Sequence, residues 1–212
     1  RQRIKRVADA MGYSVHPMIS AWVSARRSGR PLAERLPLAF LVGRAHHGEE
    51  HDAHFEGARE RAARYGFALT EFRLAEYRSN PQRLFQVLVS RGIPGLVLGS
   101  TVDAKFLRDW DWNRFACIAI GRGLADPVVH RVVADDALPG EFPAPGERLN
   151  VHRSLGGNAA DWLVQLVLRN EWGLPAERHT LMVEVRRSNP RPAESGDTHG
   201  HEGAKLDSTI LV

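Results

Sequence analysis

Leu38-Ala-Phe-Leu-Val42 is a run of five apolar residues uninterrupted by any polar one. Such a run is typical of a strand buried on both faces, as in a parallel sheet covered by helices on each side. The following stretch, residues 52–65, carries its apolar residues at helical spacing and ends at Gly66, where a helix can terminate. A buried strand that leads into an amphipathic helix predicts the start of an α/β fold.

The same alternation of strands and helices continues to about residue 136. Further strands are predicted at 67–72, 96–98, 115–120, 128–133 and 181–185, and further helices at 80–91, 103–110 and 156–170. Strands and helices that alternate in this way predict a doubly wound parallel sheet. The loop composition of residues 138–146 interrupts the pattern before its last helix and strand.

The composition indicates a soluble globular chain. Charged residues make up 25% and hydrophobic residues 43% of the 212 residues, and no apolar run approaches the ~18 residues of a membrane span. The first residues lack the apolar segment of a secretory signal, and the single cysteine, Cys117, can form no internal disulfide. We therefore expect a cytoplasmic protein with no membrane partner, in which Cys117 is a buried apolar residue rather than a catalytic thiol.

Positive charge is concentrated in residues 1–35. They hold eight Arg or Lys against two acidic residues, a net charge of +6, whereas the other 177 residues carry −2. Nucleic acid is the simplest partner for such a segment, and a solvated basic surface is the alternative. Residues 1–11 have helical spacing and end at Gly12, and a second short helix is predicted at 17–27.

Four segments, in this order, resemble those of transcription regulators of the lactose-repressor/galactose-repressor (LacI/GalR) family. Residues 1–13 resemble the third helix of the DNA-binding headpiece with its Gly-Tyr ending, and His16-Pro-Met-Ile-Ser-Ala-Trp-Val23 resembles the hinge helix. Residues 54–67 resemble the first helix of the sensing lobe with its turn into the second strand. Ser90-Arg-Gly-Ile-Pro-Gly-Leu-Val-Leu98 resembles the segment that leads into the third strand.

The resemblance implies a periplasmic-binding-protein-like lobe and a division into four parts. Residues 1–35 would be the remnant of a helix-turn-helix headpiece and its hinge, 36–136 the first sensing lobe, and 137–186 a remnant of the second lobe. Residues 187–212 are polar and rich in Pro, Gly and His, so they are expected to be a disordered tail. The regulator is therefore expected to be incomplete at its headpiece and in its second lobe.

The resemblance also implies how DNA would be bound. The hinge helix of the family wedges an apolar side chain into the minor groove, and Trp22 has that position here, where the family usually has Leu. The residues assigned to DNA are Tyr13, Met18, Ile19, Trp22, Arg26 and Arg27. Weak and sequence-independent binding is expected, because base readout belongs to the recognition helix that would precede residue 1.

Ligands of open α/β sheets bind beyond the carboxyl ends of the strands. The residues predicted to meet a ligand there are Arg44, His46, Ser100, Arg122 and Asp136. Arg and Asp suit sugar hydroxyls, and the resemblance implies a sugar-type effector held between two lobes, a homodimer and no cofactor. The second lobe, which would form the opposite wall of the ligand site, is expected to be incomplete. We therefore expect ligand binding no tighter than about millimolar, and self-association through the face of the first lobe that the second lobe would cover.

Two alternatives remain open. The first is a small-molecule-binding protein without DNA function, such as a transport receptor. The second is a zinc hydrolase, because His47-Gly-Glu-Glu-His51 satisfies the H-x-x-E-H pattern with Glu50 as a base. Since Gly48 lies inside this motif and the motif is predicted to fall in a loop after a strand, we predict no metal site, no catalytic residue and no enzyme activity.

Overall fold

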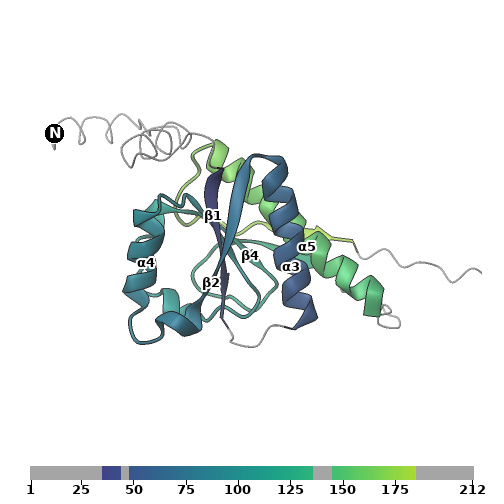
Figure 1. Cartoon of the computed structure of the whole chain (residues 1–212), viewed down its shortest axis with the longest axis horizontal. Helices are drawn as coiled ribbons and strands as arrows, with labels where there is room; N and C mark the ends of the chain where they lie inside the picture. Colours follow the sequence, from purple (N-terminus) through teal and green to yellow (C-terminus); the bar gives the residue numbers. More distant parts are fainter. Residues whose placement is uncertain (1–34, 44–47, 136–144, 185–212) are drawn as a thin grey trace, which may run out of the picture.

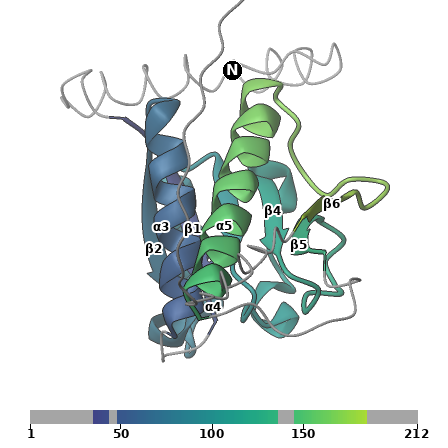
Figure 2. The same cartoon turned by 90° about the vertical axis from the view of Figure 1, so that its right-hand side faces the viewer.

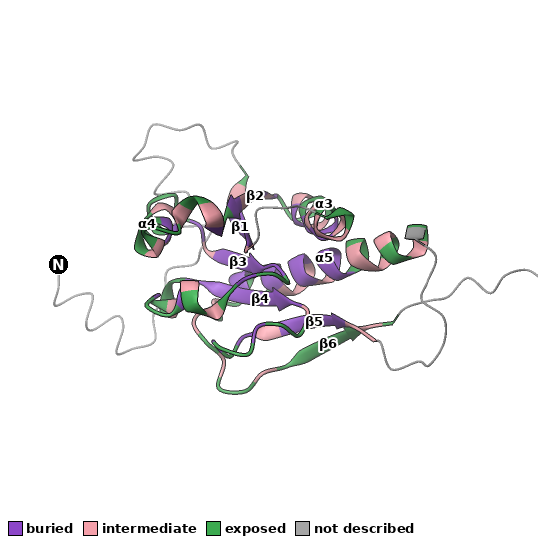
Figure 3. Ribbon diagram, turned by 90° about the horizontal axis from the view of Figure 1, so that it is seen from below, coloured by how far each residue is buried: buried purple, intermediate pink, exposed green. Residues whose placement is uncertain are grey.

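The computed structural model describes residues 35–43, 48–135 and 145–184, and every structural statement below concerns these residues. They form one sheet of six strands: β1 (Leu36–Val42), β2 (Phe67–Arg73), β3 (Gly95–Leu98), β4 (Ala116–Ile120), β5 (His130–Ala134) and β6 (Thr180–Val183). All neighbouring strands are parallel (Figures 1 and 2). Their order is β2-β1-β3-β4-β5-β6 (Figure 3). This order is that of a doubly wound sheet, so the predicted α/β fold is confirmed.

Helices cover both faces of the sheet. α3 (Glu49–Arg64) and α5 (Pro145–Leu168) lie on one face, and α4 (Pro81–Ser90) lies on the other (Figure 3). The short 3-10 helices η1 (Leu74–Tyr77), η2 (Ala104–Leu107) and η3 (Trp112–Arg114) pack on the α4 face. The helix predicted at 103–110 is thus only the turn η2. None of the helices in the described ranges is long and apolar enough to cross a bilayer.

Strand β1 contributes to the apolar cores on both faces. Leu38 and Phe40 are buried in the core formed with α3 and α5, whereas Ala39 and Leu41 are buried in the core formed with α4. Because successive side chains of a strand point to opposite faces, a strand covered on both sides has no position that favours a polar residue. This explains the uninterrupted apolar run from which the fold is predicted.

α5 is longer than its prediction from residue 156. It begins at Pro145, a residue whose fixed backbone angle suits a first helical turn. Val151 and Leu155 lie one turn apart and pack toward the core, which extends the apolar face of the helix. The sequence pattern obscures this part because Gly156 and Gly157 disfavour a helix interior.

The contact between α3 and α5 explains Gly156 of α5 and a second glycine, Gly57 of α3. A Cβ atom built on Gly57 would lie 1.9 Å from the carbonyl oxygen of Arg153, and one built on Gly156 would lie 1.9 Å from that of His54. Only a residue without a side chain fits between two backbones at this separation. The close approach also holds the polar ends of the two helices beside each other.

Candidate ligand site at the carboxyl edge of the sheet

The strand order defines one switch point, between β1 and β3. After β1 the chain passes to α3 on one face, and after β3 it passes to η2 on the opposite face. The two connections therefore diverge at the carboxyl edge of the sheet, which is where ligands of open α/β sheets bind.

The loops that follow β1 and β3 are in direct contact at this edge. The Gly43 amide donates a hydrogen bond to Thr101 Oγ1 over 3.2 Å, and a Cβ atom on Gly43 would lie 1.7 Å from the Thr101 carbonyl oxygen. The Gly99 amide donates to the Leu41 carbonyl over 2.9 Å. The glycines that end these strands are therefore required by close packing of the two loops.

Ser100 and Arg122 lie on neighbouring loops at the same edge. A Cβ atom on Gly121, whose φ is +85°, would lie 3.5 Å from the Ser100 Cβ, and one on Gly123 would lie 3.3 Å from the Ser100 carbonyl oxygen. Both Ser100 and Arg122 are exposed. The structure thus brings together two of the predicted ligand-binding residues, which lie 22 positions apart in the sequence.

Asp135 lies at the same edge, and Arg131 supports this edge from within β5. Asp135 follows β5, is half-buried, and donates its amide to the Val183 carbonyl over 2.9 Å. Arg131 is buried on β5, and its Nη2 donates to the Leu124 carbonyl over 2.9 Å. Its Nη1 lies 3.5 Å from the Arg122 carbonyl oxygen. Arg131 therefore anchors the loop that carries Arg122, a positioning role that its place in an apolar run could have suggested.

The other predicted site residues lie outside the described ranges. This group comprises the ligand-site residues Arg44, His46 and Asp136 and the hinge residues Tyr13, Met18, Ile19, Trp22, Arg26 and Arg27. Their assignments stay predictions.

The expectation that the zinc motif lies wholly in a loop is wrong. α3 begins at Glu49, so Glu50 and His51 are on its first turn, where acidic side chains favour the positive end of the helix dipole. Glu50 forms an ion pair with Arg148 of α5, and His51 Nε2 lies 3.2 Å from Glu71 Oε2. The carboxylate that would serve as a base thus faces a guanidinium, and the described side chains contain no group of three suited to a metal ion.

A histidine pair joins α3 to α5 beside this ion pair. His152 Nδ1 lies 2.9 Å from His54 Nε2, so one ring donates a hydrogen bond and the other accepts it. Burial, followed by the nearby His152 and His51, lowers the pKa of His54 to about 3. Burial likewise lowers the pKa of His152. The pair is therefore neutral near pH 7, and sequence reasoning misses it because the helix is predicted to begin after His152.

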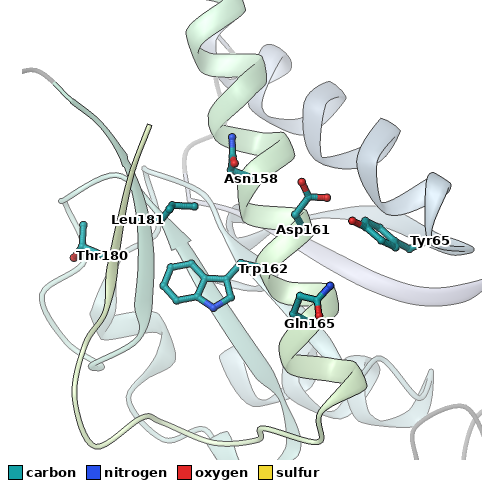
Figure 4. A pocket seen from close by; sticks show the side chains of 7 residues that line it. All are labelled: Tyr65, Asn158, Asp161, Trp162, Gln165, Thr180 and Leu181. Carbon is teal, nitrogen blue, oxygen red and sulfur yellow. The ribbon is translucent and has the colours of Figure 1, made fainter. Parts of the chain in front are cut away.

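Two cavities lie away from the carboxyl edge. A groove of about 420 Å³ runs between α5 and β6 and is lined by Tyr65, Asn158, Asp161, Trp162, Gln165, Thr180 and Leu181 (Figure 4). A smaller cavity of about 140 Å³ lies beside Cys117 and His130. Burial raises the pKa of the Cys117 thiol, which leaves the sulfur in its unreactive protonated form.

Comparisons with known proteins give structural matches only. No family model matches the chain. No curated protein matches it either. Among similar solved structures, the LacI family regulator CcpA from Weissella paramesenteroides with bound glucose is 16% identical, with a TM-score of 0.38 over 47% of this chain and 36% of that chain. A LacI regulator from Lactobacillus brevis is 15% identical, with a TM-score of 0.39 over 77% and 61%.

The Cra dual regulator from Pseudomonas putida in complex with fructose 1-phosphate is 18% identical, with a TM-score of 0.37 over 71% of this chain and 58% of that chain. The chain thus spans between 36% and 61% of the length of these three solved chains. The solved structures to which this chain is similar include transcriptional regulators of the LacI family, the family that its sequence resembles.

Proposed function

We propose that the sheet is the sensing lobe of a ligand-responsive transcription regulator and that its ligand is a sugar. The observation that carries this proposal is the meeting of Ser100 and the Arg122 loop beside the switch point of a doubly wound sheet, with Asp135 following β5 at the same edge. A hydroxyl, a guanidinium and a carboxylate supply both donors and acceptors, which is what a polyhydroxyl ligand needs.

The regulatory part of the proposal rests on the sequence. Residues 1–35 carry a net charge of +6 and resemble a headpiece helix followed by a DNA hinge. In such a device the ligand changes DNA affinity only if it binds the two conformations of the sensor unequally. Arg26 and Arg27 would then contact phosphates, and Trp22 would wedge into the minor groove.

The proposed sugar binding is tested by titrating the full chain with mono- and disaccharides up to tens of millimolar and following the chemical shifts of the backbone amides. We expect a dissociation constant of about a millimolar or weaker, because the described residues form one wall for a ligand that the resemblance places between two lobes. The shifts should gather at Ser100, Gly121 and Asp135 at the carboxyl edge.

Arg122→Ala should weaken this binding about tenfold or more, the loss of one charge-assisted contact. The matched control is Arg169→Ala, which removes another exposed arginine just after the carboxyl end of α5, where it forms an ion pair with Glu171. Shifts that gather along the α5–β6 groove, or equal losses in the two variants, would contradict the placement of the site. A sugar bound at micromolar strength would show that residues outside the described ranges complete the second wall.

The DNA part is tested separately by measuring the affinity of the full chain for duplex DNA over a range of salt concentrations. We expect weak, sequence-independent binding whose logarithm falls linearly with the logarithm of salt concentration. The double variant Arg26→Ala, Arg27→Ala should reduce the salt slope by about two, since about one counterion is released per phosphate contact. Discrimination of one operator from scrambled DNA at physiological salt would contradict this expectation, and absence of binding at low salt would remove the DNA role.

A further inference from the structure

The open edge of the sheet at β6 is apolar and exposed. Among the described strands, β6 is last in the order and pairs with β5 alone. Its side chains Leu181 and Met182 are 39% and 51% exposed, values typical of surface positions. Figure 3 shows β6 at the outer margin of the sheet, exposed along most of its length.

The main-chain groups of β6 divide between the two sides of the strand. The carbonyl oxygens of His179 and Val183 accept hydrogen bonds from Arg131 and Asp135, over 3.0 and 2.9 Å, so these alternate residues face β5. Because main-chain groups alternate along a strand, Thr180 and Met182 direct their N–H and C=O groups to the open edge. These groups are available to pair with another strand.

The opposite edge of the sheet differs in a way that matters for association. Edge strand β2 carries Glu71 and Arg73, whose side chains form an ion pair of 2.9 Å. Charges on an edge strand oppose pairing with further strands. β6, of sequence Thr-Leu-Met-Val, contains no charged residue and no proline. Of the two edges, β6 alone lacks this protection.

We propose that β6 pairs in antiparallel fashion with β6 of a second copy of this chain, about a two-fold axis at Leu181. Facing residues of antiparallel strands must be of the same hydrogen-bonding kind, so Thr180 faces Met182 of the second copy and each Met182 faces a Thr180. The two Leu181 side chains then face each other across the axis. Such an interface is closed and uses the same surface of both copies.

Charge complementarity favours this register. If the pairing continues by two residues beyond Thr180 and Met182 at each end, Arg178 lies opposite Glu184 of the second copy. The two-fold axis repeats this charge pair on its other side. Within the described ranges neither Arg178 nor Glu184 forms an ion pair, and the Arg178 guanidinium donates to the carbonyls of Val129 and Ala125 instead. Opposite charges on facing strands stabilise the pairing of those strands.

The surface beside the axis has room for the partner. Val132, the neighbour of Leu181 in the register of β5, is buried on the α5 face, and Leu181 lines the groove together with Trp162 of α5 (Figure 4). The Leu181 side chain of the second copy can therefore pack at this groove without displacing a helix. Two paired strands of four residues form a small contact compared with the roughly 1,200 Å² of a stable interface, so we expect a weak dimer that depends on concentration.

The proposal is tested by sedimentation of the full chain from micromolar to near-millimolar concentration, where a reversible monomer–dimer equilibrium is expected. Met182→Pro deletes a donor at the open edge and leaves the β5–β6 hydrogen bonds intact, so it should raise the dissociation constant at least about tenfold. Leu181→Lys should do the same, because it sets two ammonium groups against each other on the axis. The control is Val89→Lys on α4, which replaces another exposed apolar residue and should leave association unchanged.

A mixture of isotope-labelled and unlabelled chains provides a direct readout. Magnetisation transfer between the Leu181 methyl groups of the two copies is expected from the register. A monomer at every concentration would overturn the proposal, as would a dimer that is insensitive to Leu181→Lys or whose intermolecular contacts lie elsewhere. Circular dichroism of each variant separates loss of pairing from loss of fold, and the test is independent of sugar or DNA binding.

Discussion

Substitution of two adjacent glycines in α5 by alanine should have opposite effects on stability. A Cβ atom on Gly156 would lie 1.9 Å from the His54 carbonyl oxygen, whereas the nearest atom to a Cβ on Gly157 is the Gly57 carbonyl oxygen at 3.7 Å. Ordinary contact begins at 3.4 Å, so Gly156→Ala requires α3 and α5 to separate by about 1.5 Å, and no side-chain rotation can relieve a clash with the backbone. Gly157→Ala requires no movement.

The expected magnitudes follow from two opposing contributions. Overpacking costs about 1–3 kcal/mol, and a backbone clash lies at the upper end, while replacing Gly by Ala within a helix gains about 1 kcal/mol. Gly156→Ala should therefore destabilise the protein by about 2 kcal/mol and lower Tm by about 4–8 °C. Gly157→Ala should raise the unfolding free energy by up to about 1 kcal/mol and Tm by about 2–4 °C.

Urea and thermal unfolding followed by circular dichroism measure both variants under the same conditions. The two substitutions are chemically identical and adjacent, so each controls for helix propensity in the other. Equal changes in stability, or a Gly156→Ala variant as stable as the parent, would refute the close contact between α3 and α5.

Three further outcomes are expected. Because His54 has a pKa of about 3 when folded and titrates near 6.5 when unfolded, its contribution to stability is complete above about pH 6.5 and is lost as the pH falls toward 3. The loss is at most about 1.4 kcal/mol per pH unit, and His54→Leu should flatten the dependence of urea midpoints on pH over this range; an unchanged slope would contradict the burial. Cys117 should resist a thiol reagent at pH 8 until urea unfolds the protein, because its pKa is raised by burial; rapid labelling of the native state would show otherwise. Glu50→Gln removes an exposed partner of Arg148, so it should change stability by less than about 1 kcal/mol. Purified protein should show no peptidase activity for this variant to abolish, whereas stoichiometric zinc and hydrolysis that requires Glu50 would restore the enzyme alternative.

The local sequence pattern was sufficient to predict a helix or strand wherever the apolar residues of that element follow a single periodicity. The apolar run at Leu38 indicates a strand covered on both faces, and the structure places it next to the centre of the sheet, between β2 and β3. The helix predicted at 80–91 is α4, because Asn80 caps it and Pro81 begins it. From such elements the sequence by itself determined the α/β class and most strand positions, and it predicts the edge of the sheet at which a ligand would bind.

Contacts between distant segments depend on tertiary structure, because no local periodicity encodes them. The Gly57–Gly156 crossing makes glycines favourable where helix propensity alone disfavours them, and it brings His152 to His54. Ser100 and Arg122 become neighbours only through the pairing of β3 with β4. The apolar segment around Leu181 has the composition of a buried strand, yet it is exposed because it takes the last place in the sheet. Strand composition records hydrophobicity, whereas the strand order decides which apolar side chains have neighbours.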